Sequence, residues 1–249
     1  MDAQAVASDF HINVSHPTLQ IALTGPSNAD AEASTAGLNH PAVYMNLNGP
    51  PYPYSAKDWD AWFWMVSELW KYNLADLQEI NNQDQSVVAA QDWSKRKWLG
   101  RQMWHSTIRD MGNGGKFIGD ITVPRETFMY IRDEEERKRR KEENVKLEPG
   151  DPRIVWMIGF WLIPEYHRRG IMPAVLQTVM AEILPKHNAH TVHGSFFDHN
   201  TSSRKVFEKC GFSFQEVVPD AVIINPAKTN GIEKKVGTGR TKWERHSSS

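Results

Sequence analysis

The segment of residues 154–184 constrains the fold of this chain more than any other. Its first part, residues 154–163, is nearly all apolar, is rich in β-branched and aromatic residues, and lies between two prolines. It is too short to span a membrane, so it predicts a buried strand. Apolar residues then recur at spacings of three and four from Ile171 to Ile183, which predicts a helix with a broad apolar face. A buried strand, a tight turn and an amphipathic helix indicate an α/β domain.

The turn between that strand and that helix carries Arg168, Arg169 and Gly170. The start of a helix presents free backbone N–H groups and the positive end of the helix dipole, and this combination favours a phosphate. The two arginines add positive charge at the same place. The same turn also occurs as an ordinary strand-to-helix connection, so by itself it leaves both interpretations open.

The following segment completes one α/β unit. Residues 191–197 alternate weakly and predict a strand, and residues 200–209 predict a short helix with Asn200 or Thr201 as its N-cap. A Cys-Gly-Phe sequence at 210–212 then predicts a glycine-terminated exit into a strand at 214–218.

The combined pattern G-F-W-L-x-P-E-Y-x-R-R-G-I-M-x-A, followed by N-x-x-S-x-x-V-F-E-K-C-G-F, resembles the GNAT N-acetyltransferase superfamily. Within it, the chain is similar to the branch of ribosomal-protein N-terminal acetyltransferases and related small-amine acetyltransferases. The resemblance extends upstream and covers about residues 17–243. It implies a single α/β (α+β) domain whose mixed central sheet of about seven strands is flanked by helices and splayed between strands four and five.

Composition agrees with one such domain. A chain of 249 residues with 40% hydrophobic and 24% charged residues can bury one sizeable core, and its net charge of −1 gives no field that recruits nucleic acid. A single cysteine favours a reducing compartment. Residues 1–16 lack the features of a secretion signal, and no apolar run has transmembrane length. We therefore expect a cytoplasmic protein without a membrane partner, monomeric or homodimeric, with nuclear access left open.

The expected domain organisation is an N-terminal extension at 1–16 and the acetyltransferase-like domain at 17–245, with a charged insertion at 130–151. Within that insertion, residues 132–148 hold seven acidic and seven basic residues, including three i,i+4 pairs. This pattern predicts a solvated, partly helical excursion that buries little apolar area. A partner-binding or RNA-binding arm is the alternative, although the charges cancel and no aromatic residue is interleaved.

Upstream, residues 30–38 have a helical composition, and Ser55 is a suitable N-cap for a helix through Asn73. Residues 74–81 and 87–98 fit either a second helix or an irregular connection. Residues 102–110 and 116–123 predict a hairpin, because a glycine-rich turn joins two β-rich segments.

The resemblance also implies where acetyl-CoA binds. The positions that match the family's cofactor contacts fall on the predicted strand, the turn and the two helices: Phe160, Trp161, Leu162, Ile163, His167, Arg168, Arg169, Gly170, Ile171, Met172, Ala174, Asn200, Ser203 and Phe207. The family usually has Gln or Arg in place of His167 and Gly or Ala in place of Met172. Because most of a phosphate cradle is backbone, these differences weaken the motif more than the physical argument.

The catalytic positions depart further from the family. Met157 stands where relatives usually have a glutamate base, and Phe207 where they have a tyrosine acid. Ser203 matches a serine placed to serve the departing thiolate in the ribosomal-protein branch, although a helix serine without chemistry explains it equally well. For the base we prefer Asp120, with His105, Glu126, Glu165 or a chain of waters as alternatives.

The expected activity is transfer of acetyl from acetyl-CoA, with CoA as product, to a primary amine of a small molecule or a polypeptide N-terminus. The alternative is a catalytically weak or inactive acyl-CoA-binding protein. Aromatic residues suited to an acceptor are Tyr52, Tyr54, Trp62 and Trp104. We expect no metal, because the histidines at 187, 190 and 193 lack ligand-spaced partners and are interpreted as surface residues.

Overall fold

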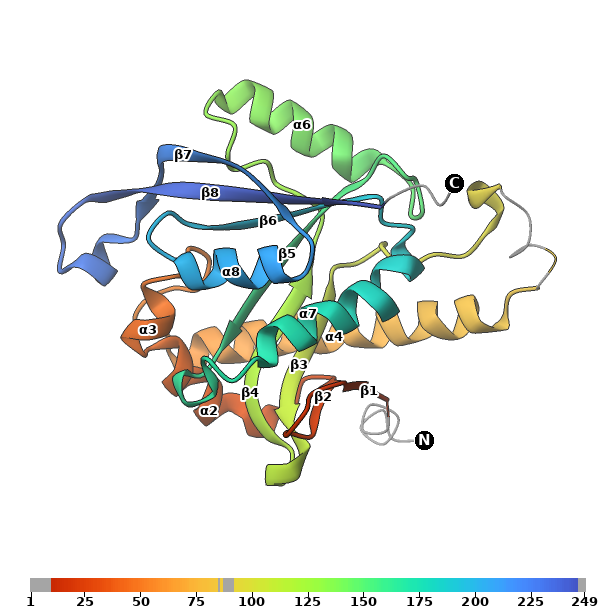
Figure 1. Cartoon of the computed structure of the whole chain (residues 1–249), viewed down its shortest axis with the longest axis horizontal. Coiled ribbons are helices and arrows are strands. Elements are labelled where there is room, and N and C mark those ends of the chain that lie inside the picture. Colours follow the sequence, from red (N-terminus) through yellow and green to blue (C-terminus); the bar gives the residue numbers. More distant parts are fainter. Residues whose placement is uncertain (1–9, 85, 87–91, 246–249) are drawn as a thin grey trace.

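The computed structural model describes residues 10–84, 86 and 92–245. Within them, one eight-stranded sheet has the order β1-β2-β3-β4-β5-β6-β8-β7 (Figure 1). Neighbouring strands are antiparallel except β5 and β6, which are parallel. The strands are β1 (His11–Val14), β2 (Ile21–Thr24), β3 (Trp104–Asp110), β4 (Lys116–Val123), β5 (Val155–Leu162), β6 (Thr191–Phe197), β7 (Ser213–Ile224) and β8 (Lys234–Glu244). The predicted mixed α/β sheet is confirmed, with eight strands rather than about seven.

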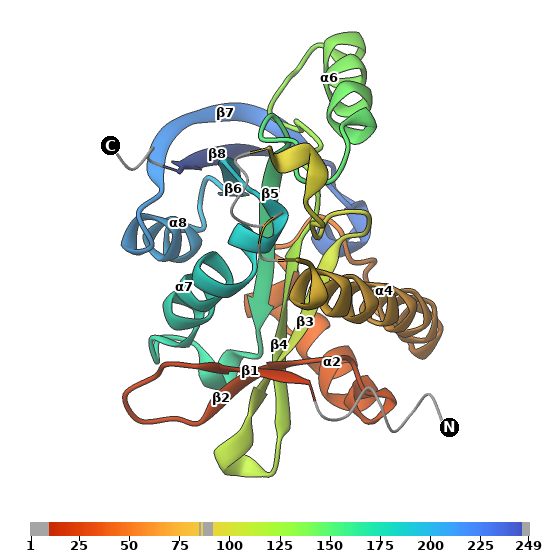
Figure 2. The same cartoon turned by 90° about the vertical axis from the view of Figure 1, so that its right-hand side faces the viewer.

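Helices cover both faces of this sheet. Figure 2 shows α7 and α8 on one face and α2 and α4 on the other. We call these the α7/α8 face and the α2/α4 face. The helices are α2 (Ala31–Leu38), α3 (Pro41–Tyr44), α4 (Ala56–Asn82), α6 (Glu134–Lys146), α7 (Ile171–Glu182) and α8 (Thr201–Lys209).

Helix α4 is longer than its sequence pattern predicts. Ser55 caps α4 as expected, and its backbone N–H donates to the carboxylate of Asp58 in return (2.8 Å). The helix continues past Asn73 because Leu77 is buried in the core and the side chain of Asn73 donates to the carbonyl of Met103 (3.0 Å). Residues 74–81 are therefore part of this helix, while residues 87–91 lie outside the described residues.

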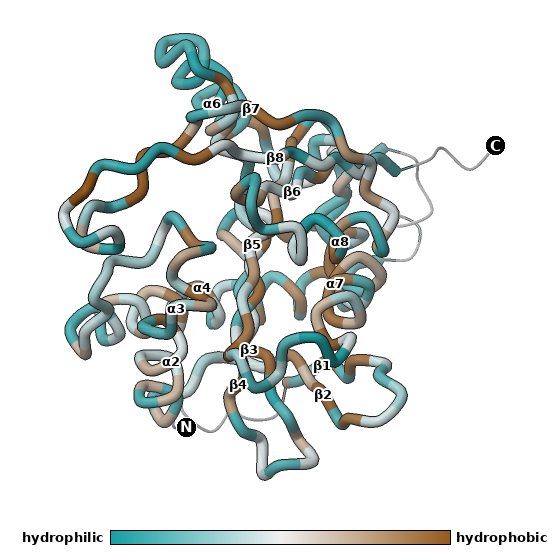
Figure 3. The backbone as a smooth tube through the Cα atoms, turned by 60° about the vertical axis from the view of Figure 1, so that its left-hand side comes forward, coloured by the Kyte–Doolittle hydropathy of each residue, from teal (hydrophilic) through white to brown (hydrophobic). Residues whose placement is uncertain are grey.

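The core lies between β5 and the helices on either side of it. Trp70, Trp104 and Trp156 are among its largest fully buried side chains, with Ile158 and Val179 packed in the same cluster. The chain coloured by hydropathy shows the same division, with hydrophobic segments along α7 and the central strands and a mostly hydrophilic α6 (Figure 3). Most of the tryptophans thus act as core residues.

The sheet opens between β5 and β6. These strands pair in parallel from Val155 and Thr191 to Ile158 and Gly194. Beyond this point β5 pairs only with β4, and β6 pairs only with β8. The predicted splay is confirmed. In the observed numbering it lies between the fifth and sixth strands. The number is one higher than predicted because an additional edge strand, β1, forms within the segment predicted as an extension and pairs with β2.

The charged insertion is attached more firmly than its composition predicts. Asn144 of α6 is 4% exposed; its Nδ2 donates to the carbonyl of Val155 (2.8 Å), and its Oδ1 accepts from the N–H of Val155 (2.9 Å). One guanidinium nitrogen of Arg125 donates to three carbonyls at the C-terminal end of α6. Ten of the thirteen residues of α6 are exposed, which fits the prediction of a solvated, partly helical segment, but its anchoring to the core by Asn144 and Arg125 was not predicted.

Candidate active site

The turn between β5 and α7 is held in a strained shape. A short 3₁₀ helix, Pro164–Tyr166, leads into it, and Arg168 has a positive φ of 61°. Gly170, the N-cap of α7, has a φ of 78°, which glycine adopts without steric cost. The ring of His167 folds back so that its Nε2–H donates to the carbonyl of Leu162 (2.8 Å). These features fix how the first turn of α7 faces the end of β5.

The N-terminal segment also secures this turn. The Nε2 of His16 lies 2.9 Å from the carbonyl oxygen of Arg169, and the backbone N–H of Leu19 donates to the Nδ1 of the same ring (3.1 Å). Since Nδ1 accepts, Nε2 carries the proton and donates. From the sheet side, the hydroxyl of Tyr166 donates to the carboxylate of Asp110 (2.8 Å). No sequence pattern indicates the His16 contact, which joins residues far apart in the chain.

A cavity of about 640 Å³ opens beside this turn. Its volume lies within the range of about 300–1,000 Å³ that is usual for ligand sites. Its wall combines residues predicted to hold the cofactor with residues that were not predicted: Ala42, Val43, Asn46, Leu47, Phe160, Trp161, Leu162, Tyr166, His167, Arg168, Arg169, Gly170, Ile171, Met172, Pro173, Asn200, Ser202, Ser203, Lys205, Val206 and Lys209. Of the predicted cofactor residues, Ile163, Ala174 and Phe207 do not line it.

One end of the cavity favours an anion. The backbone N–H groups of Ile171 and Met172 belong to the first turn of α7, where N–H groups have no partner within the helix. Arg168 and Arg169 approach from the turn, and Lys205 and Lys209 from α8. The lysines were missed, although Ser202, Lys205 and Lys209 share one side of a helix by their spacing. The N–H groups, the helix dipole and four cationic residues suit a phosphate.

The other end of the cavity reaches the opening in the sheet. The N–H groups of Met157 and Ile163 donate to carbonyls of residues 124 and 118, on the β4 side. Because successive N–H groups of a strand point in opposite directions, those of Phe160 and Leu162 point away from β4, toward the gap that β6 leaves. An extended, amide-containing chain can therefore pair with this free edge of β5.

Helix α8 presents two of the predicted polar residues to the cavity. The Oδ1 of Asn200 accepts from the N–H of Ser203 (3.1 Å), so Asn200 is the N-cap, as predicted. Ser203 is half-buried. Phe207 is 1% exposed, lies 5.3 Å from the ring of Phe160 and fills the space beside Gly194. Its expected cofactor contact is therefore corrected: it forms the packing behind the wall.

The four predicted acceptor residues are only partly accessible. Trp104 has no exposed surface and packs against Trp70 with ring centroids 5.6 Å apart, so a contact of Trp104 with a ligand is excluded. Tyr54 is 6% exposed, and its burial, with the charges of Asp58 and Asp120, raises its pKa. Tyr52 and Trp62 are half-buried, and they stay candidates.

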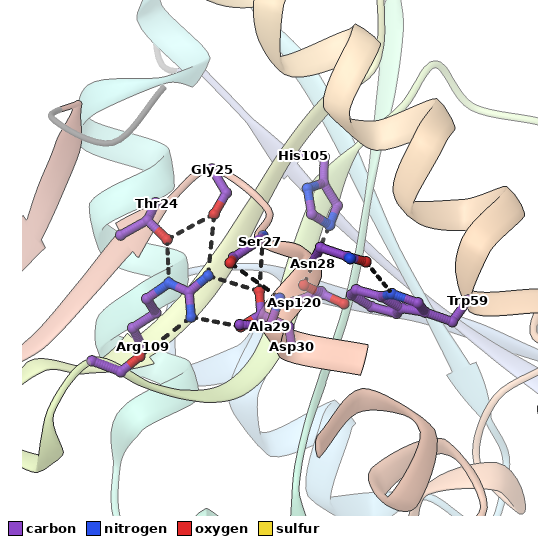
Figure 4. Close-up of polar contacts among 11 residues, drawn as sticks. Thr24, Gly25, Ser27, Asn28, Ala29, Asp30, Trp59, His105, Arg109 and Asp120 are labelled. Atoms are coloured by element: carbon purple, nitrogen blue, oxygen red, sulfur yellow. Dashed lines mark hydrogen bonds and ion pairs between the residues drawn. The ribbon is translucent and has the colours of Figure 1, made fainter. Parts of the chain in front are cut away.

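The preferred base, Asp120, lies in a polar group on the α2/α4 face (Figure 4). Its carboxylate is 3.3 Å from the Nε2 of His105, whose two ring nitrogens have no hydrogen-bond partner and whose exposure is 1%. Asp120 pairs with Trp161 across β4 and β5, and it does not line the cavity. Nearby, Arg109 forms a two-pronged ion pair with Asp30 (2.8 and 2.7 Å), which ties α2 to β3.

The remaining base candidates occupy different environments. Glu165 is exposed beside the turn. Glu126 is 5% exposed, and its Oε2 lies 3.0 Å from the Nδ1 of His193. His193 and His187 were interpreted as surface residues, but His193 is 5% exposed and His187 is fully buried, which lowers the pKa of His187 to about 4. That interpretation is wrong for both: the weak alternation of β6 concealed the burial of His193, and His187 ends a short 3₁₀ helix, Leu184–His187, that packs on the core.

The residues present therefore fit an acyl-CoA molecule: a cationic helix start for phosphates, an apolar cavity wall, and a free strand edge for an amide-containing arm. Among the described ranges, no group of three or more His, Cys, Asp or Glu side chains is arranged to hold a metal ion. No helix in those ranges is both long enough and apolar enough to cross a bilayer.

Comparisons with known proteins agree with this geometry. Ribosomal-protein-S5-alanine acetyltransferase from Vibrio fischeri superposes with a TM-score of 0.59 at 15% identity, covering 95% of this chain and 97% of that one. RimJ from Mycobacterium smegmatis, in complex with CoA-disulfide, gives 0.56 at 14% identity over 94% and 86%. RimL, a ribosomal L7/L12 α-N-protein acetyltransferase in complex with coenzyme A, gives 0.55 at 14% over 94% and 98%.

At these identities the structural likeness establishes the fold. Comparison with curated protein sequences found no significant match. The sequence profile of the acetyltransferase (GNAT) domain, in contrast, matches residues 52–213, which is more than half of the chain and includes β5, α7 and α8 of the cavity wall. The chain therefore belongs to the acetyltransferase (GNAT) domain family.

Proposed function

We propose that this protein is an acetyl-CoA-dependent N-acetyltransferase of the cytoplasm, which transfers acetyl to a primary amine of a small molecule or a polypeptide N-terminus. The observation that carries the proposal is the single cavity that joins the cationic start of α7 to the free edge of β5. The RimL and RimJ structures, which share the fold, were solved with CoA and CoA-disulfide. A reduced, buried Cys210 is compatible with the cytoplasm.

Different residues would bind the phosphates and the pantetheine arm of acetyl-CoA. The N–H groups of Ile171 and Met172, with Arg168 and Arg169, would hold the phosphates. The free N–H groups of Phe160 and Leu162 would hold the pantetheine amides beside β5 and polarise the thioester carbonyl. Acetyl-CoA supplies an activated acyl carbon. Binding along the free edge of β5 and at the start of α7 would orient that carbon toward the α2/α4 face, from which an amine can approach.

Two proton transfers remain for side chains or solvent. An amine with an ordinary pKa near about 10 is mostly protonated at neutral pH and must lose a proton before it attacks. The thiolate that leaves must then gain one. Ser203 lines the cavity and can donate to that sulfur, and Asp120 stays a candidate base that no contact yet links to the cavity.

Replacing Ser203 by alanine tests its assigned role. We expect turnover to fall by about tenfold or more, with little change in the CoA dissociation constant, because the hydroxyl would act mainly as the thiolate develops. Steady-state kinetics and calorimetric titration measure the two quantities. Thr201→Ala, an exposed change in the same helix that lies outside the cavity wall, is the matched control. Equal turnover of both variants would leave Ser203 a packing residue.

Turnover with a panel of primary amines tests the proposed function itself. The panel should include polyamines, amino acids, aminoglycosides and peptides with a free N-terminus, and the assay should record both free thiol and acetylated amine. Burial raises the pKa of the Cys210 thiol to about 11, so this cysteine will not contribute to the thiol signal. CoA binding without any acetylated product would favour the alternative of a CoA-binding protein without activity. Met157 and Phe207 support that alternative, because they replace the usual glutamate base and tyrosine acid.

A further inference from the structure

Met157 occupies the position at which relatives usually have a glutamate base, and a histidine lies beside it on the neighbouring strand. Met157 pairs with His193 of β6, one residue before the last paired positions, Ile158 and Gly194. His193 therefore lies next to the point where β5 and β6 separate, behind the cavity wall rather than in it, as Asp120 does. Adjacent strands lie about 4.8 Å apart, so a side chain at this register borders the same space as the side chain of Met157.

His193 also lies on the face from which an amine can approach. Side chains at 157, 159 and 161 alternate to one face of β5, and Trp161 contacts Gly37 of α2. The side chain of Phe160 points to the opposite face, where it contacts Phe207 of α8. Because paired residues of neighbouring strands share a face, His193 points with Met157 and Trp161 toward the α2/α4 face.

The hydrogen bonds of this histidine fix its tautomer. Its Nδ1 lies 3.0 Å from Oε2 of Glu126, so Nδ1 carries the proton and donates to the carboxylate. The other carboxylate oxygen of Glu126 accepts from the N–H groups of Thr127 and Phe128 (both 2.8 Å), which fixes the orientation of the carboxylate toward His193. In the described part of the chain, Nε2 of His193 has no hydrogen-bond partner. The neutral ring therefore keeps a lone pair on Nε2.

Contacts from α6 and β5 hold the loop that carries Glu126 in place. Phe128 has a positive φ of 57°, a conformation that costs energy for a bulky residue, and it is 2% exposed. The guanidinium of Arg140 in α6 lies 5.4 Å from its ring. Asn144 of α6 and Val155 of β5 hydrogen-bond the backbone of Glu126 from either side. The insertion thus helps to position the carboxylate against His193.

The other charged groups around the ring are themselves paired. Tyr130 contacts the ring at 5.8 Å, and Arg240 stacks on Tyr130 and forms an ion pair with Glu216 (2.8 Å). Lys242 of β8, directly opposite His193, forms an ion pair with Glu244 (2.8 Å). Glu126 is the one carboxylate that hydrogen-bonds to the ring among the described residues.

We propose that His193 is the general base of the acetyl transfer and that Glu126 is its positioning residue; this inference rests on the proposed function. Nε2 takes a proton from the ammonium form of the acceptor, and the neutral amine attacks the thioester carbon. The new C–N bond forms, the C–S bond breaks, and the second nitrogen-bound proton passes to the departing thiolate. His193 then releases its proton to solvent, so protons and charges balance.

Substitutions test this assignment in the full-length protein. We expect His193→Gln to lower kcat about 100-fold, with acetyl-CoA affinity unchanged, because general-base catalysis typically contributes at least this factor. In the same variant, the fall of kcat/KM at acidic pH (the acidic limb) should disappear from the pH profile. Glu126→Gln should also lower kcat and should shift that limb, since it removes the charge that holds the tautomer. The control is His199→Gln, an exposed histidine whose Nδ1 lies 3.6 Å from Asp198. Wild-type kcat in His193→Gln, or loss of the limb in Asp120→Asn instead, overturns the assignment.

A second measurement does not depend on turnover. In protein with ¹⁵N-labelled imidazoles, the signal of His193 is assigned by its absence in His193→Gln. At pH 8 we expect the Nδ1–H tautomer, with signals that shift when CoA is added. The Nε2–H tautomer, or signals indifferent to bound CoA, would overturn the proposal. If the wild type acetylates no amine, the proposed function fails on that ground, while the tautomer still decides whether Nε2 can accept a proton.

Discussion

Replacing Arg168 and Arg169 together by glutamate should lower the affinity for CoA by about 100-fold or more. Both side chains line the cavity beside the free N–H groups of α7, and charge-assisted hydrogen bonds contribute about 1.5–3 kcal/mol each. A tenfold change in affinity corresponds to about 1.4 kcal/mol. Calorimetric titration should show this loss, and CoA should no longer raise the melting temperature, because a ligand stabilises the folded state only by binding to it.

A charge-matched variant separates local contacts from net charge. Lys138→Glu with Lys141→Glu changes the net charge equally, but these residues are exposed on α6, away from the cavity wall. We expect this variant to bind CoA like the wild type. Equal loss of affinity in both variants would mean that the phosphate site does not lie at the start of α7.

The second large effect concerns stability. Asn144→Ala should lower the free energy of unfolding by about 2–3 kcal/mol, because it removes the side chain that satisfies both the N–H and the carbonyl of Val155. An unsatisfied buried polar group costs about 1–3 kcal/mol. Urea denaturation measures the difference. We also expect the turnover per folded molecule to change, because the side chain of Asn144 donates a hydrogen bond to the carbonyl of Glu126 (3.4 Å).

The neighbouring residue Glu142 provides the control for this measurement. It is exposed on the same helix, so Glu142→Ala should change the free energy of unfolding by less than about 0.5 kcal/mol. If Asn144→Ala is no less stable than Glu142→Ala, then α6 is the free excursion that its composition predicts, and deletion of residues 132–148 would leave the fold intact.

Features set by local sequence were predictable. The strand and helix around the turn, the caps at Ser55 and Asn200, and the left-handed glycine at 170 each depend on a few neighbouring residues. These elements also account for the anion-binding end of the cavity, because a strand, a turn and a helix in this order place the helix start beside the strand end; the wall residues between 42 and 47 were not predicted.

Features set by distant contacts were not predictable. The burial of Asn144 within a run of charges depends on the backbone of Val155, which a composition argument does not contain. The pairing of His193 with Glu126 joins a strand residue to a loop residue with 66 residues between them, and neither side chain has a partner at metal-ligand or helical spacing. Strand alternation likewise did not reveal that Trp104 faces the core.

A crystal structure of the protein with CoA tests the central claim most directly, namely that one cavity holds the nucleotide at α7 and the thiol at the opening of the sheet. We predict pyrophosphate oxygens within about 3 Å of the N–H groups of Ile171 and Met172, and pantetheine amides beside Phe160 and Leu162. The sulfur should lie between Ser203 and the point where β5 and β6 separate. CoA bound elsewhere, or a pantetheine arm that leaves the edge of β5 unpaired, would contradict the account.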